Sequence, residues 1–100
     1  MVESLAPIDQ AIWVAKSLFD RGKTSGSTAN ISFRHENGIY ITSSGTCFGF
    51  LTSASFSLLD EAGTCIGGAA PSKEYPLHMA IYKQRPHVRA VIHTHSFYSV

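Results

Sequence analysis

Two histidines near the end of the chain have the type and spacing that metal binding requires. His93 and His95 close an apolar run and are separated by one residue. In a strand, such residues project from the same face with Cα atoms about 6.6 Å apart, so both imidazoles can bind one ion. A catalytic zinc ion generally takes three protein ligands and keeps one position open for water or substrate. The pair therefore predicts two ligands of a metal site, with surface or hydrogen-bonded core histidines as the alternative.

Glu74 is the candidate general acid/base. It follows a short loop and opens a predicted helix, where a nearby metal and burial would set the proton affinity of its carboxylate. The helix dipole also favours a carboxylate in a first turn, so the sequence leaves a purely structural role open. His78 lies in an apolar helical segment, which favours a hydrogen-bonded structural histidine over a third metal ligand. His35 and His87 fall in predicted turns and are expected to face solvent.

Three polar segments carry the groups that bind phosphate. They span residues 24–30, 43–45 and 72–73, and they combine hydroxyls with glycines and free backbone N–H groups. We expect Ser44-Gly45 and Ser72 to approach one another as an anion site, because both segments offer free backbone donors. Each segment is also compatible with an ordinary turn. None of them matches a P-loop or a GxGxxG motif, so the sequence does not indicate a nucleotide.

Apolar periodicity assigns these residues to helices and short strands. In chain order we expect a helix over 7–21, strands over 31–34 and 39–42 that form a hairpin through Asn37-Gly38, a strand over 56–60, a loop over 67–71, a helix over 72–85, a strand over 89–95 and a helix start over 96–100. Gly22 and Pro86 are expected to end the two complete helices. Leu77, Ala80 and Ile81 are expected to form the buried side of the second one. This order predicts a single α/β domain without repeats or linkers.

Composition restricts the classes of function. The chain has 100 residues, 44% of them hydrophobic and 15% charged, which suffices for one small core. The formal net charge of +1, with scattered Lys and Arg, gives no field that would attract nucleic acid. Apolar stretches are too short for a membrane span and the N-terminus carries acids where a signal peptide carries bases, so a cytoplasmic protein without membrane partners is expected. Cys47 and Cys65 lie far apart, as buried or partly buried reduced thiols would.

Four segments, taken in order, closely resemble the class II aldolase/adducin family. They are Gly26-Ser27-Thr28-Ala29-Asn30-Ile31-Ser32, Thr42-Ser43-Ser44-Gly45, Pro71-Ser72-Lys73-Glu74-Tyr75-Pro76-Leu77-His78 and Ala90-Val91-Ile92-His93-Thr94-His95-Ser96. The similarity runs from about Leu18 to the last residue. It implies an α/β fold of three α/β/α layers with a mostly antiparallel central sheet. Residues 1–100 would form the N-terminal half of one such domain, in a protein about twice this length.

Within this family, one branch is most similar to the chain. The Gly-Ser-Thr form of the first loop, the Phe48–Leu51 stretch and Ser72-Lys73-Glu74 look most like the 3-oxo-tetronate 4-phosphate decarboxylases. That branch implies a zinc-dependent carbon–carbon lyase of carbohydrate metabolism, which converts 3-oxo-tetronate 4-phosphate to dihydroxyacetone phosphate and carbon dioxide. The fuculose- or ribulose-phosphate aldolases are the first alternative. A non-catalytic adducin-like binding protein is the second, and the presence of Glu74, His93 and His95 argues against it.

The resemblance also implies roles for individual residues. His93 and His95 would be two of three histidines that bind one zinc ion per subunit, with the third beyond Val100. Glu74 would be the catalytic acid/base that also reaches the metal. The residues that would line the phosphate and substrate site are Ala29, Asn30, Ser44, Gly45, Ser72 and Lys73. The aldolase pattern usually has glycine in place of Ala29 and serine in place of Lys73, and a cation there suits a further anionic group on a small phosphorylated sugar acid. A homotetramer is also implied, because members of this family commonly form one.

Overall fold

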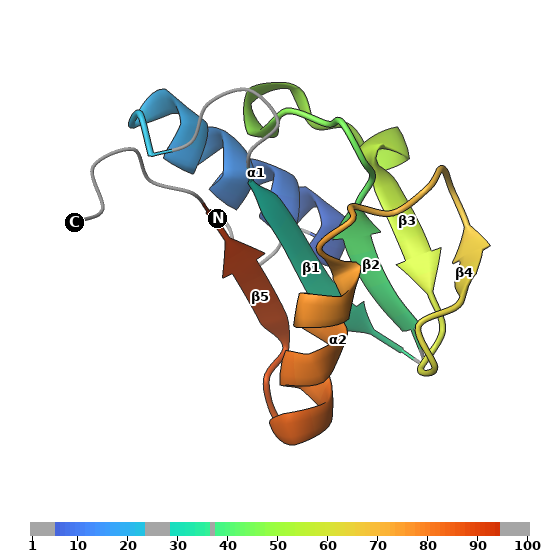
Figure 1. Cartoon of the computed structure of the whole chain (residues 1–100). Coiled ribbons are helices and arrows are strands. Elements are labelled where there is room, and N and C mark those ends of the chain that lie inside the picture. Colours follow the sequence, from blue (N-terminus) through green and yellow to red (C-terminus); the bar gives the residue numbers. More distant parts are fainter. Residues whose placement is uncertain (1–5, 24–28, 37, 95–100) are drawn as a thin grey trace.

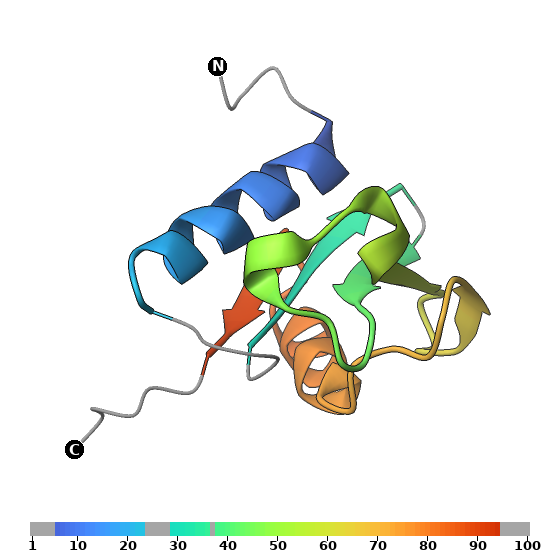
Figure 2. The same ribbon diagram turned by 90° about the horizontal axis from the view of Figure 1, so that it is seen from above.

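A five-stranded antiparallel sheet with one helix on each face forms the described part of the chain. The computed structural model describes residues 6–23, 29–36 and 38–94. The strand order is β4-β3-β2-β1-β5. The elements are α1 (Pro7–Asp20), β1 (Asn30–His35), β2 (Gly38–Thr42), the 3-10 turns η2 (Phe48–Phe50) and η3 (Ser53–Ser55), β3 (Phe56–Leu59), β4 (Cys65–Gly67), α2 (Tyr75–Gln84) and β5 (Ala90–His93). Figures 1 and 2 show α1 and α2 on opposite faces of the sheet, which confirms the predicted α/β class and its antiparallel sheet.

Helix α1 begins and ends within one residue of the prediction. Pro7 occupies its first turn, where a missing N–H costs no hydrogen bond. Gly22 leaves the helix with a φ of 73°, and its N–H bonds to the carbonyl of Phe19 at 3.0 Å. The N–H of Lys23 bonds to the carbonyl of Leu18 at 2.9 Å. These two bonds satisfy carbonyls of the last turn in a Schellman arrangement, which glycine permits because it adopts a positive φ at no steric cost.

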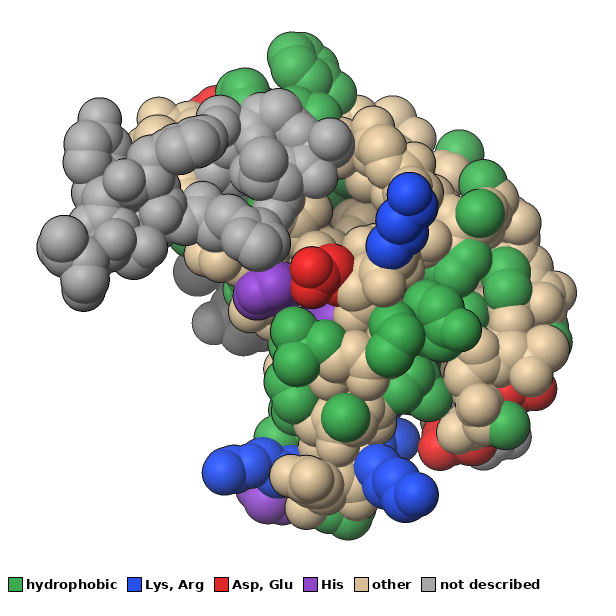
Figure 3. All heavy atoms as spheres, viewed as in Figure 1, with side chains coloured by type: hydrophobic (Ala, Val, Ile, Leu, Met, Phe, Trp, Pro, Cys, Tyr) green, Lys and Arg blue, Asp and Glu red, His purple; other side chains and the backbone are tan. Residues whose placement is uncertain are grey.

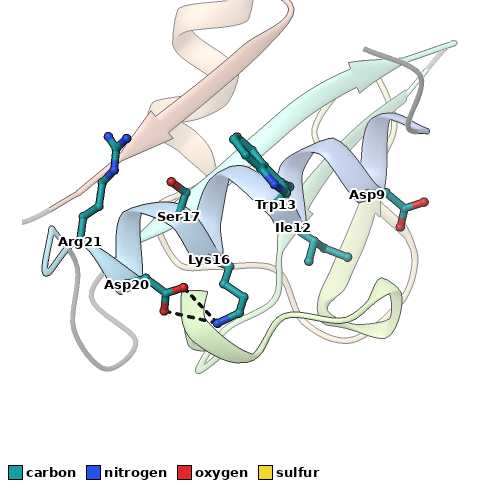
Figure 4. Close-up of a pocket in the computed structure, with 7 residues that line it drawn as sticks. All are labelled: Asp9, Ile12, Trp13, Lys16, Ser17, Asp20 and Arg21. Carbon is teal, nitrogen blue, oxygen red and sulfur yellow. Dashed lines mark hydrogen bonds and ion pairs between the residues drawn. The ribbon is translucent and has the colours of Figure 1, made fainter. Parts of the chain in front are cut away.

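The side of α1 that faces away from the sheet carries a pocket (Figure 4). Its lining residues are Asp9, Ile12, Trp13, Lys16, Ser17, Asp20 and Arg21. Lys16 and Asp20 form an ion pair of 3.2 Å one helical turn apart, and Trp13 is 55% exposed. This pocket lies on the other face of the sheet from α2, so it is separate from the end of α2 that carries Glu74.

Within the described ranges, no helix is long and apolar enough to cross a membrane.

Side chains alternate between the two faces of the sheet, and the face under α1 is apolar. Ile31 and Phe33 of β1 pack with Ala11 and Ala15 of α1 in the hydrophobic core. Phe33 stacks on Tyr40 of the paired strand, with ring centroids 5.3 Å apart. Small residues on the helix let it lie close to the sheet, so apolar burial holds this side of the domain together.

The face under α2 combines apolar and polar side chains. Asn30, Ser32 and Arg34 of β1 point to it, because they alternate with the core residues of the opposite face. Helix α2 buries His78 and Tyr82 against this face, one helical turn apart. Hydroxyl, amide and imidazole groups therefore meet in a place where most domains have only apolar contacts.

The predicted buried side of α2 is wrong. Leu77 is 41% exposed, Ala80 is exposed and Ile81 is half-buried. The prediction placed the apolar residues of α2 on its buried side, but the face of the sheet that α2 covers carries polar groups. Polar side chains of α2 gain hydrogen bonds by facing those groups, and buried polar atoms need such partners.

Helix α2 also begins later than predicted. It starts at Tyr75, three residues after the expected start at Ser72, because Pro76 fits only the first turn of a helix. Its end at Gln84, ahead of Pro86, is as expected. The late start makes Glu74 the residue at the N-terminal boundary of the helix rather than a member of its first turn.

Strand β5 lies at one edge of the sheet and is shorter than predicted. It covers Ala90–His93 and pairs only with β1 among the described strands. His95 and the predicted helix start over 96–100 lie outside the described residues. That His93 and His95 point the same way therefore stays a prediction.

The hairpin is confirmed, but its turn lies one residue earlier than predicted. Strands β1 and β2 pair with His35 opposite Gly38, so Gly38 belongs to the strand, and Glu36 has the positive φ of 54°. Asn37 lies outside the described residues. A β-carbon on Gly38 would come within 2.8 Å of Cδ1 of Leu58. It would also lie 3.1 Å from the carbonyl oxygen of Leu59, so the glycine serves close packing inside the sheet and not the turn.

A short strand that the sequence analysis missed completes the sheet. Strand β4 pairs with β3 at the position where a loop was expected to begin. In the connecting turn, Oδ1 of Asp60 accepts hydrogen bonds from the N–H groups of Ala62 and Thr64, at 3.0 and 2.9 Å. A strand of three residues is too short to show an alternating pattern. Cys65 is exposed on this strand, whereas a buried or partly buried thiol was expected.

Replacing Gly68 with alanine is expected to lower the free energy of unfolding by about 2–4 kcal/mol. Gly68 has a φ of 81°, and a β-carbon there would lie 2.6 Å from the carbonyl oxygen of Phe56. Gly22→Ala is the matched control, because Gly22 has a φ of 73° with nothing within 4 Å of its β-carbon. The control should cost only about 1 kcal/mol. Urea unfolding of the complete protein measures both, and equal losses would contradict the close approach at Gly68.

Candidate active site

Glu74 and His93 come together from two different elements. Glu74 lies directly before α2, and His93 is the last residue of β5. Nδ1 of His93 lies 3.1 Å from Oε2 of Glu74. The side chains of His93 and Glu74 are 29% and 38% exposed, and Figure 3 shows a histidine and an acidic side chain in contact at the surface next to α2. A titratable carboxylate and an imidazole therefore share one accessible position.

Asn30 lies beside this pair. It is opposite His93 in the register of β1 and β5, and side chains of directly opposed residues point to the same face of a sheet. Asn30 is buried, with 5% of its surface exposed. The structure thus brings together a predicted substrate residue and a predicted metal ligand that are far apart in the sequence.

A chain of buried hydrogen bonds holds Asn30 from the interior. Nε2 of His78 contacts Oδ1 of Asn30, and Nδ1 of His78 lies 2.6 Å from Oγ of Ser32. The same Oγ of Ser32 lies 2.7 Å from the hydroxyl of Tyr82. His78 has no exposed surface and both its ring nitrogens have partners, which agrees with the structural role favoured for it from the sequence.

Acid is expected to destabilise the protein through His78. Burial lowers the pKa of His78 from 6.5 to about 4, and repulsion from His93 acts in the same direction. Between these values the unfolded chain binds a proton that the folded chain does not, so this stability is complete above pH 6.5 and is lost as the pH falls towards 4. The loss is on the order of 3 kcal/mol.

Urea unfolding of chelator-treated protein between pH 7 and pH 4.5 measures this loss, because without metal no proton competes for a zinc ligand. His78→Gln should remove the corresponding part of the pH dependence, and His87→Gln, which changes an exposed residue, should not. A His78→Gln profile parallel to that of the unmodified protein would contradict the prediction.

Two of the three segments predicted to bind phosphate, 43–45 and 72–73, lie next to each other. Residues 24–28 of the third segment lie outside the described residues. An antiparallel bridge joins the two neighbouring loops, and the N–H of Ser44 bonds to the carbonyl of Ala70 at 2.9 Å. The N–H of Ser72 bonds to the carbonyl of Thr42 at 3.0 Å. These bonds confirm that the loops approach one another. They also correct one expectation, because the N–H groups of Ser44 and Ser72 hold the loops together and are not free for an anion.

The other predicted phosphate residues differ in what they offer. Oγ of Ser72 accepts a hydrogen bond from the N–H of Glu74 at 3.2 Å, which leaves its hydroxyl hydrogen for a ligand. Gly45 and Lys73 are exposed on the same two loops. Ala29 is different, because its side chain is buried in the core under α1. Only the backbone of Ala29 is therefore suited to contact a substrate.

Two of the described side chains near the end of β5 are of types that bind zinc in proteins. Imidazole nitrogen and carboxylate oxygen are both ligand types that zinc takes, and Glu74 and His93 supply one of each. Within residues 6–23, 29–36 and 38–94, no three His, Cys, Asp or Glu side chains gather closely enough to hold a metal ion. His95 lies outside these ranges, so its role as a ligand stays a prediction.

Ser32, Tyr82 and Arg34 are the residues of this site that the sequence analysis missed. Nη2 of Arg34 donates to the carbonyl of Tyr82 at 2.9 Å, and the guanidinium carbon lies 4.7 Å from the centre of the Tyr82 ring. The signal that could have found them is the alternation of Asn30, Ser32 and Arg34 with apolar residues along one strand. His78 and Tyr82, four residues apart on α2, are the matching polar stripe.

Comparisons with known proteins find one family over most of the chain. Residues 9–100 match the family described as Class II Aldolase and Adducin N-terminal domain. The chain is 40% identical over 91 residues to L-fuculose phosphate aldolase of Methanococcus vannielii, a match that covers 91% of this chain and 50% of that protein. It is 37% identical over 95 residues to 3-oxo-tetronate 4-phosphate decarboxylase of Haemophilus influenzae, which covers 94% of this chain and 45% of that protein.

A solved structure shares the fold. The crystal structure of YgbL from Klebsiella pneumoniae matches with a TM-score of 0.85 and 34% identity, over 91% of this chain and 44% of that one. The chain therefore spans about half the length of the relatives that it matches. The residues that match the family, 9–100, include Glu74 and His93.

Proposed function

Because the chain belongs to the class II aldolase and adducin family, we propose that the complete protein is a zinc-dependent lyase that breaks a carbon–carbon bond in a small phosphorylated sugar acid or sugar. The observation that carries the proposal is the 3.1 Å approach of Glu74 to His93, beside the buried amide of Asn30. An adducin-like binding protein has no need of an accessible acid and imidazole beside a buried amide. A homotetramer stays a prediction from the family resemblance, and a cytoplasmic location stays a prediction from the sequence.

Zinc suits the side chains that meet at this position. Glu74 can accept the hydrogen on Nδ1 of His93, which leaves the lone pair of Nε2 for a metal. His93 and His95 are the proposed ligands, and a third histidine would come from the part of the complete protein that this chain does not cover. Bound zinc supplies a Lewis acid that polarises the ketone oxygen of the substrate.

The reaction proposed first is the decarboxylation of 3-oxo-tetronate 4-phosphate. The bond between C1 and C2 breaks, C1 leaves as carbon dioxide, and the electron pair passes to C2 and the ketone as an enediolate. Glu74 then donates a proton at C2, which gives dihydroxyacetone phosphate. Asn30 and the hydroxyls of Ser44 and Ser72 hold the phosphorylated substrate, so that the bond to be broken keeps its orientation.

Lys73 favours the decarboxylase over the aldolase. It is exposed directly before Glu74, at the N-terminal end of α2. The substrate of the decarboxylase carries a carboxylate in addition to its phosphate, and an ammonium group at this position attracts a second anion. An aldol substrate such as fuculose 1-phosphate carries the phosphate only.

Aldol cleavage is the second candidate, and the 40% identity to L-fuculose phosphate aldolase favours it. That reaction reaches the same enediolate by releasing an aldehyde in place of carbon dioxide. Glu74 and His93 would serve both reactions in the same way. The residues that contact the rest of the substrate therefore decide between them.

The zinc-loaded complete protein is expected to release carbon dioxide from 3-oxo-tetronate 4-phosphate faster than it cleaves fuculose 1-phosphate. Lys73→Ser should lower kcat/KM for the decarboxylation by about tenfold, through loss of a charged contact, and should leave aldol cleavage unchanged. Lys83→Ser, at the exposed far end of α2, is the matched control. Assays of carbon dioxide and dihydroxyacetone phosphate measure both reactions. Efficient aldol cleavage without release of carbon dioxide would put the aldolase in place of the decarboxylase.

A further inference from the structure

The buried hydrogen bonds behind Asn30 run in one direction. Oδ1 of Asn30 can only accept, so Nε2 of His78 donates to it. A neutral imidazole then has its lone pair on Nδ1, which accepts from the hydroxyl of Ser32 over 2.6 Å. Ser32 has no second hydroxyl hydrogen, so Tyr82 donates its own to Oγ of Ser32 over 2.7 Å. Hydrogens therefore point from Tyr82 through Ser32 and His78 to Asn30.

Both ends of this row of hydrogen bonds are held in place. At one end, the guanidinium of Arg34 lies 4.7 Å from the centre of the Tyr82 ring and donates to the carbonyl of Tyr82 at 2.9 Å. Ser32, His78 and Tyr82 have 2% or less of their surface exposed, so bulk water does not compete for the bonds. At the other end, His78 occupies the amide oxygen of Asn30. The two amide N–H groups are then the polar part of Asn30 that can face a ligand beside His93.

We propose that His78, Ser32 and Tyr82 are positioning residues, which fix the amide of Asn30 so that its N–H groups donate to an anionic oxygen of the substrate. This inference rests on the proposed function, because it places a phosphorylated or enolised substrate beside Asn30 and His93. The two orientations of an amide have nearly the same shape, so packing alone does not select one of them. The bond from His78 selects it, and the opposite orientation would turn an amide oxygen towards the anion.

The tautomer of His78 tests the direction of the chain without any substrate. Nitrogen NMR of the complete protein labelled at histidine should show His78 protonated on Nε2 and unprotonated on Nδ1 at neutral pH. Comparison with the spectrum of His78→Gln assigns the signals. A proton on Nδ1 would reverse the donor and acceptor in each of these hydrogen bonds and would turn the amide of Asn30 around. This result would overturn the proposal, whatever activity the protein has.

A double-mutant cycle separates positioning from a merely structural role. His78→Gln should lower kcat/KM by about tenfold for the substrate that the unmodified protein turns over, with zinc content unchanged. In the background of Asn30→Ala, the same substitution should have little further effect, because the amide that His78 positions is absent. A loss of the same size in both backgrounds would show that His78 acts independently of Asn30, and would overturn the proposal.

Tyr82→Phe is a milder variant that should fold as the unmodified protein does. It keeps the ring against which Arg34 packs and removes only the hydrogen bond to Ser32, so kcat/KM should fall by about three- to tenfold. Tyr75→Phe is the matched control, because Tyr75 is an exposed tyrosine of the same helix. Equal effects of the two substitutions would overturn the proposal.

The failure of the proposed function can be told apart from the failure of this inference. If the unmodified, zinc-loaded protein turns over neither substrate, the proposed function fails. Dihydroxyacetone phosphate, the product common to both reactions, then serves as the probe in a calorimetric binding experiment. Weaker binding by His78→Gln and Tyr82→Phe, together with the Nε2 tautomer, would still support the positioning role. Unchanged binding by both variants would overturn it.

Discussion

Replacing His93 with alanine is expected to remove bound zinc and activity from the complete protein in a single step. His93 is the proposed ligand that the structure places beside the carboxylate of Glu74, at 3.1 Å. Its loss leaves the site one ligand short of the three that catalytic zinc generally takes. The affinity for zinc should fall by more than about 100-fold, because loss of an outer-shell partner alone costs about 10–100-fold. Metal analysis after dialysis and an assay of turnover measure the two effects together.

His87→Ala is the matched control for His93→Ala. His87 is exposed in the turn that follows α2, so its replacement should leave both zinc content and turnover unchanged. His93→Ala protein that keeps one zinc ion per subunit would exclude His93 as a ligand. Full turnover by that variant would exclude it from catalysis as well.

The sequence predicted those elements that local rules determine. Helix α1 has an apolar stripe along one side, a proline that is allowed in its first turn and a glycine that is needed at its end, so its bounds could be predicted within one residue. The hairpin follows from two short strand patterns with a turn between them. The displaced turn shows the limit of such rules, because Gly38 packs closely against Leu58 and Leu59 of the neighbouring strand β3, and no local pattern contains that contact.

The buried side of α2 could not be predicted from the sequence of α2. Its apolar residues suggested Leu77 and Ile81 as the core positions, but His78 and Tyr82 are the buried ones. Their burial is favourable because β1 supplies partners: Ser32 bonds to both of them, and Asn30 bonds to His78. A helix whose partners are polar buries polar residues, and the partners are known only after the strands have been placed.

The candidate site was predictable as a set of residues but not as an arrangement. Glu74, His93 and Asn30 were singled out by type, motif and resemblance, and their closeness follows from a register between β1 and β5 that the sequence does not state. The loops around Ser44 and Ser72 were expected to approach one another, and they do. Their backbone N–H groups were expected to be free, and the bonds that bring the loops together use them.

Replacing Glu74 with glutamine is expected to lower turnover by on the order of 10²-fold or more while zinc stays bound. Glutamine keeps the size of the side chain and can still face His93, but it cannot give or take the proton that the proposed reaction needs at C2. The carboxylate of Glu74 makes no side-chain capping bond to α2, so its removal should change the free energy of unfolding little. Metal analysis, urea unfolding and turnover of the same preparation measure the three quantities.

The comparison of turnover with stability decides which role Glu74 has. A residue that only favours the start of α2 through the helix dipole would lose at most about 1 kcal/mol on neutralisation and would leave the reaction intact. A general acid/base would lose the reaction and leave the fold intact. Glu61→Gln is the matched control, because Glu61 is an exposed carboxylate that pairs with Arg34 at 3.5 Å, and it should change neither quantity much. Glu74→Gln protein with full turnover and lower stability would assign Glu74 to the helix and remove it from the proposed mechanism.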